Sequence, residues 1–458
     1  MPSVEEALEF MKSNDMRWVD LQFADVDGQL RHKTVSARGF SEEAFATGIE
    51  SDLSEIFGFS GKALTLVPDQ DTFARIPWEP NTLRLFSNVF SMPEKERFMK
   101  DSRYSIERVN INAKAMGISE VELGSDCEFY VFDNVTGDRL SPERGPNYLI
   151  DTREASWNPS PFWNFKSGAY MGQPHDTLYA ARVQMAEIME DHFRCGVESH
   201  SHGRSPNGQQ RIKVKELGAK SAADALLTLK YVARNIAFIA SNVATFMPLP
   251  VMGDKGSSLN ITSRLRKGAT NLFYDAKGDY AQLSSTALYY IGGILEHADA
   301  LSVFTIPGTN SFRKMKADPR YAAWSLTSPN ALVNVQSAVK DEERTVSFTG
   351  ADPSVNPYLA YAALVAAGLD GIKNKADPGK PVSEDLSQMD SKRMKEMKIK
   401  PLPASVGEAL AALESDNKFL KGFISSELLA DYLEQRLAEQ GENERRPTAY
   451  EMEKYFNK

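Results

Sequence analysis

The segment SDCEFYVF at residues 125–132 places two carboxylates on one face of an otherwise apolar strand. Successive side chains of a strand point to opposite faces, so Asp126 and Glu128 share a face with Tyr130. Two carboxylates this close together bind a cation, perform acid–base chemistry or meet basic side chains. An edge strand with a solvated face is the plainer alternative. The fold must therefore give this face either a partner or access to solvent.

A later pair of alternating segments offers such a partner. In RIKVK, the side chains of Arg211, Lys213 and Lys215 share one face. If this strand lies beside the acidic one, guanidinium–carboxylate pairing satisfies both faces without a metal. The preceding segment, VESHSH, puts His200 and His202 on one face. Two such histidines can hold a transition metal, but the segment has no recognisable set of further ligands.

Composition narrows the class of protein. The chain has 458 residues, of which 42% are hydrophobic and 25% charged, as expected for a globular protein with room for two domains. A formal net charge of -9 argues against a nucleic-acid binder. With only Cys127 and Cys195, a reducing, cytoplasmic location is the simplest expectation. We expect no membrane span, because the apolar stretch 286–306 is interrupted by charged residues.

Hydrophobic periodicity divides the chain into two units. A short helix at 4–12 precedes a hairpin of strands at 18–23 and 30–35, joined by the turn DVDG. We place the domain boundary just before a helix that begins near residue 102, giving domains 1–102 and 103–458. The second unit mixes strands with helices expected at 177–193, 222–240, 283–304, 357–372, 408–413 and 426–439. The charged stretch 376–401 is the only plausible linker.

Read in order, several motifs resemble segments of glutamine synthetases. They are RWVDLQFADVDGQLRHKTV, LVPDQDTFARIPW, GSDCEFYVFD, ALYYIGGILEHADALSVFTIPGTNSF and DPSVNPYLAYAALVAAGLDGI, and the tail RRPTAYEMEKYF fits the type I enzymes. The resemblance covers nearly the whole chain. It implies an α+β fold, with a small N-terminal β-grasp-like domain followed by a large catalytic-type domain whose curved antiparallel sheet is flanked by helices. It also implies hexameric rings, usually stacked as a dodecamer.

The resemblance also implies a chemistry of nitrogen metabolism. In the family, ATP phosphorylates the side-chain carboxylate of glutamate, and ammonia then displaces the phosphate, with Mg²⁺ or Mn²⁺ neutralising the phosphates. Asp52 matches the family's aspartate that deprotonates ammonium, and Asp126 and Glu128 match two metal ligands. Tyr170 and Gly256 match substrate-site positions.

The remaining ligand positions of the family carry other residues here. In the first metal site, two glutamate positions fall on Gly203 and Arg211. In the second, a histidine position falls on Asn260 and a glutamate position on Ser347. Hard cations need several oxygen ligands, so Asp126 and Glu128 are expected as a remnant only. The resemblance implies that Arg211 repels magnesium and pairs with one of the two carboxylates.

The substrate side has changed as well. Arg320 falls near the position of the family's flap glutamate, and we take Lys314 and Arg320 as substrate-binding candidates. No motif fixes the register of residues 314–349 to better than a residue or two. The glycine-rich segment GDKGSS at 253–258 matches neither the P-loop nor the dinucleotide fingerprint, and a surface turn explains it more simply.

Three functions are consistent with these residues. The leading hypothesis is a homologue that has lost ATP- and metal-dependent glutamate–ammonia ligation and needs no cofactor. Such a protein would act as a structural, regulatory or ligand-sensing pseudoenzyme, and it could co-assemble with an active paralogue. The alternative is an ATP-dependent or metal-independent carboxylate–amine ligase with an altered substrate. The third is an active glutamine synthetase that uses ATP and Mg²⁺ or Mn²⁺.

Overall fold

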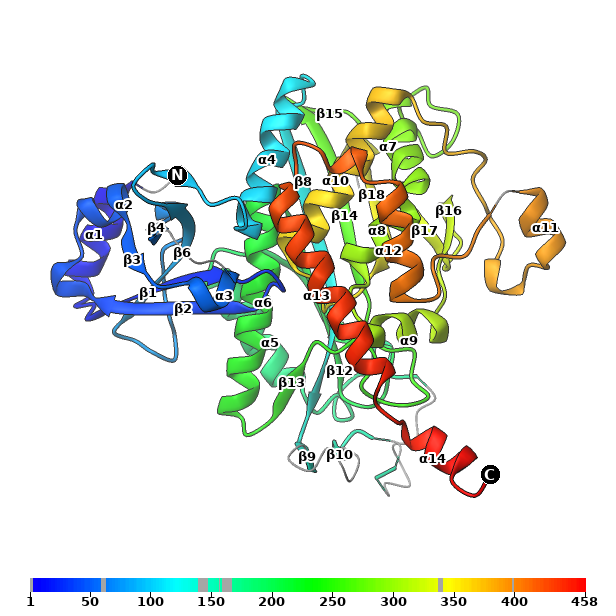
Figure 1. Cartoon of the computed structure of the whole chain (residues 1–458), viewed down its shortest axis with the longest axis horizontal. Helices are drawn as coiled ribbons and strands as arrows, with labels where there is room; N and C mark the ends of the chain where they lie inside the picture. Colours follow the sequence, from blue (N-terminus) through cyan, green and yellow to red (C-terminus); the bar gives the residue numbers. More distant parts are fainter. Residues whose placement is uncertain are drawn as a thin grey trace.

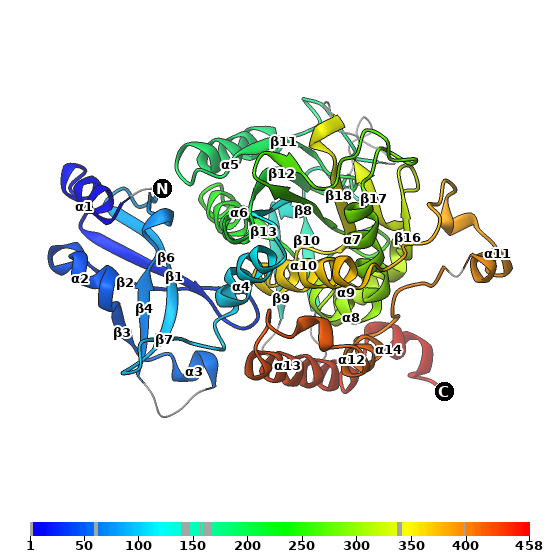
Figure 2. The same ribbon diagram turned by 90° about the horizontal axis from the view of Figure 1, so that it is seen from above.

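Two sheets of unequal size organise the protein (Figure 1). The computed structural model describes residues 3–58, 63–138, 147–155, 157–158, 167–336, 341–397 and 399–458. Figure 2 shows the small N-terminal sheet at one side and the large sheet with its helices at the other. The predicted α+β fold is confirmed. Among the described helices, none has the length and apolar character needed to cross a membrane.

The N-terminal sheet has the strand order β2-β1-β6-β4-β3. Its described elements are α1 (Val4–Ser13), β1 (Trp18–Ala24), β2 (Leu30–Ser36), α2 (Glu42–Thr47), β3 (Ile49–Ser51), α3 (Ser54–Phe57), β4 (Leu64–Pro68), β5 (Ala74–Arg75), β6 (Thr82–Ser91) and β7 (Glu96–Arg97). The predicted hairpin is confirmed, with β1 and β2 antiparallel. Its turn needs Gly28, where φ is 76° and a Cβ would lie 2.6 Å from the Cα of Asn356.

The large sheet has the order β11-β12-β8-β14-β18-β17-β16. Its strands are β8 (Glu120–Phe132), β11 (Val197–His202), β12 (Gln209–Gly218), β13 (Val243–Thr245), β14 (Leu259–Lys267), β15 (Thr270–Asn271), β16 (Tyr321–Ser325), β17 (Ala331–Gln336) and β18 (Thr345–Ala351). All described pairs in it are antiparallel except β16 with β17. A separate hairpin is formed by β9 (Asn134–Asp138) and β10 (Asn147–Asp151).

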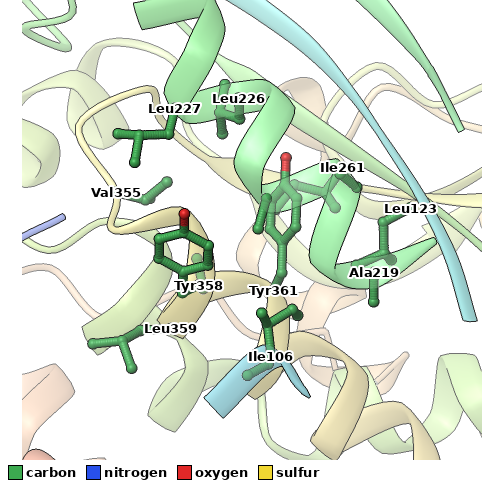
Figure 3. Close-up of a cluster of buried hydrophobic side chains, with 14 of the residues drawn as sticks. Ile106, Leu123, Ala219, Leu226, Leu227, Ile261, Val355, Tyr358, Leu359 and Tyr361 are labelled. Atoms are coloured by element: carbon green, nitrogen blue, oxygen red, sulfur yellow. The ribbon is translucent and has the colours of Figure 1, made fainter. Parts of the chain in front are cut away.

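The described α-helices from residue 102 onward belong to the same part of the chain as this sheet. They are α4 (Ser102–Ala115), α5 (Tyr179–Asp191), α6 (Ala219–Ile239), α7 (Ser285–Glu296), α8 (Ala298–Thr305), α9 (Thr309–Ala317), α10 (Pro357–Asn374), α11 (Ser391–Glu396), α12 (Val406–Ser415), α13 (Ser426–Glu444) and α14 (Ala449–Tyr455). The core is built around α10, which begins at the cap Asn356. In Figure 3, Tyr358 and Tyr361 of α10 lie among Ile106 of α4 and Leu226 of α6.

Two sequence predictions about elements need correction. The helix expected at 283–304 is two helices that meet at His297, whose ring nitrogens lie 2.7 Å from Asp416 and 3.2 Å from Asp370. Long-range contacts, invisible to periodicity, set this break. The stretch 376–401 is not a free linker either, because Val382 and Leu386 are buried against residues of β16 and β17.

A buried ion network joins the N-terminal sheet to the helices of the large sheet. Arg103 of α4 donates to Asp69 at 2.7 Å and to both carboxylate oxygens of Asp224 in α6, at 3.0 and 2.7 Å. Lys220 also donates to Asp69, at 2.6 Å. Burial works against the Asp69 carboxylate, but Arg103 and Lys220 outweigh it and lower its pKa to about 2. The N-terminal sheet is therefore held in place through fixed charges.

Candidate active site

The two carboxylates of the acidic strand lie in the middle of the large sheet. Asp126 and Glu128 belong to β8, which pairs with β12 on one side and β14 on the other, and each is 5% exposed. The edge-strand alternative is therefore wrong. The expected partner strand is confirmed, since Arg211 of β12 stands directly opposite Glu128. A polar face buried on a central strand needs partners for every oxygen.

Arg211 pairs diagonally with Asp126 and not with its direct neighbour on the sheet. Its Nε donates to Oδ1 of Asp126 at 2.7 Å, and its Nη2 donates to Oδ2. These two parallel bonds form a bidentate pair. The hydrogen bonds to Asp126 are the main reason that the pKa of Arg211 is raised above its usual range. Asp126 is thus fully engaged.

Glu128 is held by a residue that sequence reasoning missed. Arg204 donates from Nε and Nη2 to the two carboxylate oxygens of Glu128, both at 3.3 Å. It also donates to the Ser258 hydroxyl at 3.1 Å and to Asp318 at 3.2 Å. The Ser258 backbone N–H donates to Glu128 at 2.9 Å. Burial disfavours the Arg204 cation, but Glu128 and Asp318 outweigh burial and raise its pKa.

A second group of charges lies on the other side of Arg204. Arg320 donates to Asp318 at 3.0 Å, while the Nζ of Lys314, in α9, is 3.9 Å from the same carboxylate. Burial lowers the pKa of Lys314 to about 8, with Arg320 contributing. Burial disfavours the Asp318 carboxylate, yet Arg320, Lys314 and Arg204 hold its pKa well below the usual range.

Lys314 is the most unusual member of this group. Its side chain is fully buried, and its Nζ has no hydrogen-bond partner among the described residues. Gly256, with φ at 72°, packs against it, since a Cβ there would lie 2.9 Å from Cγ of Lys314. Asp352 is also buried nearby, where burial raises its pKa and so favours the neutral acid. Arg204, whose side chain is 33% exposed, connects this charge to the surface.

Two other predicted site residues, Tyr170 and Asp52, are exposed. Tyr170 is 77% exposed, with φ at 56°. Asp52 is exposed in the N-terminal unit between β3 and α3, where its described hydrogen bonds come from the backbone and hydroxyl of Ser54. Those bonds lower its pKa. Figure 2 shows α3 well apart from β8. One chain therefore does not bring Asp52 together with Glu128.

The residues at the predicted metal positions do not fit a divalent ion. Asn260 lies on β14 opposite Asp126, and Ser347 is buried on β18. A Cβ at Gly203 would lie 2.5 Å from the Gln209 side chain, which fills the space where a ligand would be needed. In the described parts of the chain, no three His, Cys, Asp or Glu residues are arranged to hold a metal.

The histidine pair does not form a site either. The Nε2 of His202 lies 3.0 Å from a carboxylate oxygen of Glu154, and its Nδ1 lies 3.0 Å from the Gly203 carbonyl oxygen. His200 accepts from Arg182 at 3.2 Å. Both nitrogens of His202 are therefore occupied by protein partners, which rules out metal ligation in this arrangement.

One pattern in the sequence pointed to Arg204. His200 and His202 share one face of β11, and every second residue after them, including Arg204, would lie on the same face if the strand continued. β11 itself ends at His202. The only sequence signal for Asp318 was weaker: it is an acidic residue two positions before Arg320, in a segment whose alignment with the family no motif fixes. Both residues act through the turn and loop geometry that follows regular elements, which periodicity does not specify.

Comparison with known proteins covers almost the entire chain. Residues 15–92 match the family model for the glutamine synthetase beta-Grasp domain, and residues 99–455 match that for the glutamine synthetase catalytic domain. A glutamine synthetase of Sulfolobus acidocaldarius is 38% identical over 441 residues, covering 94% of this chain and 93% of the relative. One from Frankia alni is 33% identical over 478 residues, covering 99% of each. The fold matches that of Plasmodium falciparum glutamine synthetase, with a TM-score of 0.87, 22% identity and 99% coverage of both chains.

These relatives overturn the leading hypothesis from the sequence. The sequence had suggested a pseudoenzyme that has lost ligation. Relatives that are 38% and 33% identical to the chain over nearly their full length are named glutamine synthetases, which contradicts that hypothesis. The hypothesis gave the combined changes at the ligand positions more weight than the similarity that the rest of the chain shares with these enzymes. It ignored charges that the folded chain supplies from other positions, among them Arg204 and Asp318. The chain belongs to the glutamine synthetase family.

Proposed function

We propose that the protein is a carboxylate–amine ligase, which forms an amide bond between a substrate carboxylate and an amine. L-Glutamate and ammonia are the first pair to test, since they are the substrates of the enzymes for which the family is named. Identity of 38% over 94% of the chain supports this assignment. Fold alone would not, because one fold hosts many reactions.

The observation that carries the proposal is the excess of positive charge around Arg204. Three cations, Arg204, Lys314 and Arg320, surround the two carboxylates of Glu128 and Asp318. A buried ammonium without a hydrogen bond is costly unless an anion completes its surroundings. Arg204 is the exposed member and is suited to bind a carboxylate through its planar fork. The cluster is therefore suited to an anionic substrate.

The amine side of the reaction is proposed to involve Asp52. Its carboxylate is exposed and hydrogen bonds from Ser54 lower its pKa, so it stays ionised at neutral pH and can attract an ammonium ion. Because Asp52 is remote from Glu128 within one chain, we propose that it serves the site of a second copy. Hexameric rings, stacked as a dodecamer, would supply that contact.

Further roles follow from the same proposal. ATP is the expected co-substrate that activates the carboxylate. Tyr170 is proposed to lie at the edge of the substrate site, and Gly256 to leave room beside Lys314. We place the boundary of the two domains at 102/103, where α4 begins. A cytoplasmic location remains the expectation from the two free cysteines.

The test is amide formation by the purified full-length protein. Isotopically labelled ammonia, L-glutamate and ATP are supplied, once with Mg²⁺ and once with EDTA, and labelled glutamine is measured by mass spectrometry. We expect turnover that Asp52→Asn abolishes and that Arg153→Gln, in an exposed pair with Asp133, leaves unchanged. Absence of amide with glutamate and with a panel of other carboxylates and amines, in both conditions, would reject the proposal.

A further inference from the structure

Each oxygen of the two carboxylates of β8 already accepts a hydrogen bond from a guanidinium. Both oxygens of Asp126 accept from Arg211, and both oxygens of Glu128 accept from Arg204. One Glu128 oxygen also accepts from the Ser258 backbone N–H. Mg²⁺ binds through one or two carboxylates together with waters and substrate phosphates, and Ca²⁺ takes six to eight oxygen ligands. To bind here either ion would have to displace a guanidinium from each carboxylate.

Both guanidiniums come from one stretch of the chain. Arg204 follows β11 directly, and Arg211 is on β12, the next strand of the same hairpin. β12 also pairs with β8 along most of its length, so the hairpin lies along the acidic strand. Sheet register therefore fixes the pairing of Arg211 with Asp126, while Arg204 reaches Glu128 from the turn that joins β11 to β12.

Local packing prevents the hairpin from supplying ligands instead. The space beside Gly203 is filled by Gln209, whose amide donates to the Gly256 carbonyl at 3.0 Å and to the Ser257 hydroxyl at 3.1 Å. Its carbonyl oxygen accepts from the Ser205 backbone N–H at 2.8 Å. With all its groups engaged, Gln209 cannot move aside without breaking several buried hydrogen bonds. The Gly203 position is closed to a carboxylate side chain.

We propose that Arg204 and Arg211 are built-in cations that permanently take the places of divalent ions at Glu128 and Asp126. The protein then binds its anionic substrate through guanidinium groups, with no divalent ion on these two carboxylates. Positive charge at a fixed position can polarise and hold an anion as a metal does, but it leaves no open coordination position. This inference concerns the ion content of the site and holds whichever reaction the protein performs.

Manganese is the probe, because it is paramagnetic and binds to oxygen ligands. Mn²⁺ is titrated into the full-length protein and followed by electron paramagnetic resonance and by calorimetry, without nucleotide. We expect no stoichiometric binding tighter than roughly 1 mM, the weak end of the range known for oxygen-ligated Ca²⁺ sites. Weaker binding that Glu128→Gln does not change belongs to the surface and is consistent with the proposal.

A double variant tests the cause directly. In Arg204→Gln/Arg211→Gln the carboxylates are released, and we expect the affinity for Mn²⁺ to rise by about tenfold or more. Adding Glu128→Gln to that variant should remove the gain, and Arg153→Gln should show none. If the double variant does not fold, as judged by circular dichroism, the wild-type titration still decides. Stoichiometric Mn²⁺ binding by the wild type that is lost in Glu128→Gln overturns the proposal.

The manganese experiment is independent of the ligase assay. A protein that forms glutamine and also binds Mn²⁺ at Glu128 would refute the built-in cations and leave the proposed function standing. A protein that forms no amide and binds no Mn²⁺ would refute the proposed function and support the built-in cations. Each result therefore concerns only one of the two proposals.

Discussion

Replacing Lys314 with methionine should make the protein more stable and weaken its hold on an anionic substrate. Lys314 is fully buried, its Nζ has no hydrogen-bond partner in the described chain, and the nearest carboxylate oxygen recorded for it is 3.9 Å away. Methionine has similar length and no charge, so Lys314→Met removes the buried cation without leaving a large cavity. Asp318 keeps its pairs with Arg320 and Arg204.

The magnitude follows from the pKa of Lys314. It is lowered from 10.5 to about 8, and a tenfold change in a protonation equilibrium corresponds to about 1.4 kcal/mol. Folding therefore disfavours the charged form by about 3 kcal/mol at neutral pH, which is an upper limit for the gain. Imperfect packing of methionine will take back part of it, so we expect the free energy of unfolding to rise by about 1 to 3 kcal/mol.

The difference should depend on pH in one direction only. Between about pH 8 and 10.5 the unfolded chain binds more protons at Lys314 than the folded protein does, so the wild type gains stability as the pH rises. The advantage of Lys314→Met is full below pH 8 and vanishes above 10.5. The affinity for L-glutamate should fall by roughly tenfold at pH 7, since nearby positive charge is lost.

Urea unfolding of both proteins at pH 7 and pH 10, at one protein concentration, measures the stability, and calorimetry measures glutamate binding. Lys316→Met is the matched control, because Lys316 is exposed on the same helix. We expect it to change stability by less than about 0.5 kcal/mol. If Lys314→Met is less stable than the wild type while Lys316→Met is neutral, the ammonium has a stabilising partner and the reasoning about the cation excess fails.

Three further predictions concern other parts of the molecule. Arg103→Gln removes a 1% exposed cation that serves two carboxylates, and it should lower the free energy of unfolding by about 3–5 kcal/mol in urea. Burial disfavours the charged form of His202, but the hydrogen bond and the charge of Glu154 outweigh burial and raise its pKa. The stability that His202 confers is therefore present below pH 6.5 and is lost as the pH rises through the raised pKa. Glu154→Gln should flatten this pH dependence of the free energy of unfolding, measured by urea titration. Asp52→Asn should leave urea stability unchanged while amide formation is lost, and a clear loss of stability would show that the residue is structural.

Patterns of short range predicted much of the fold. Alternation of side chains identified the acidic strand and its basic neighbour, and their pairing is the central contact of the large sheet. The opening hairpin was predicted from the turn DVDG, and the helix expected at 357–372 is observed as α10 (Pro357–Asn374). Such signals work because the backbone periods of strands and helices fix which face a side chain occupies.

Other features depended on contacts between distant segments. His297 interrupts a continuous apolar stretch because its ring stacks on Phe419, with centroids 4.2 Å apart, while two aspartates meet its nitrogens. At the candidate site, Arg211 was identified from its position, but its choice of Asp126 over Glu128 depends on Arg204 holding the latter. No local pattern contains that competition between two arginines.

The backbone N–H of Ser258 has a consequence for protein redesign. It holds one oxygen of Glu128 at 2.9 Å, beside the contacts from Arg204. Any substitution at 258 except proline keeps that amide, so Glu128 stays oriented whatever side chains surround it. A chemist who wished to install a metal here would find one ligand already aimed, and would need to clear two guanidiniums and shorten Gln209 before adding others.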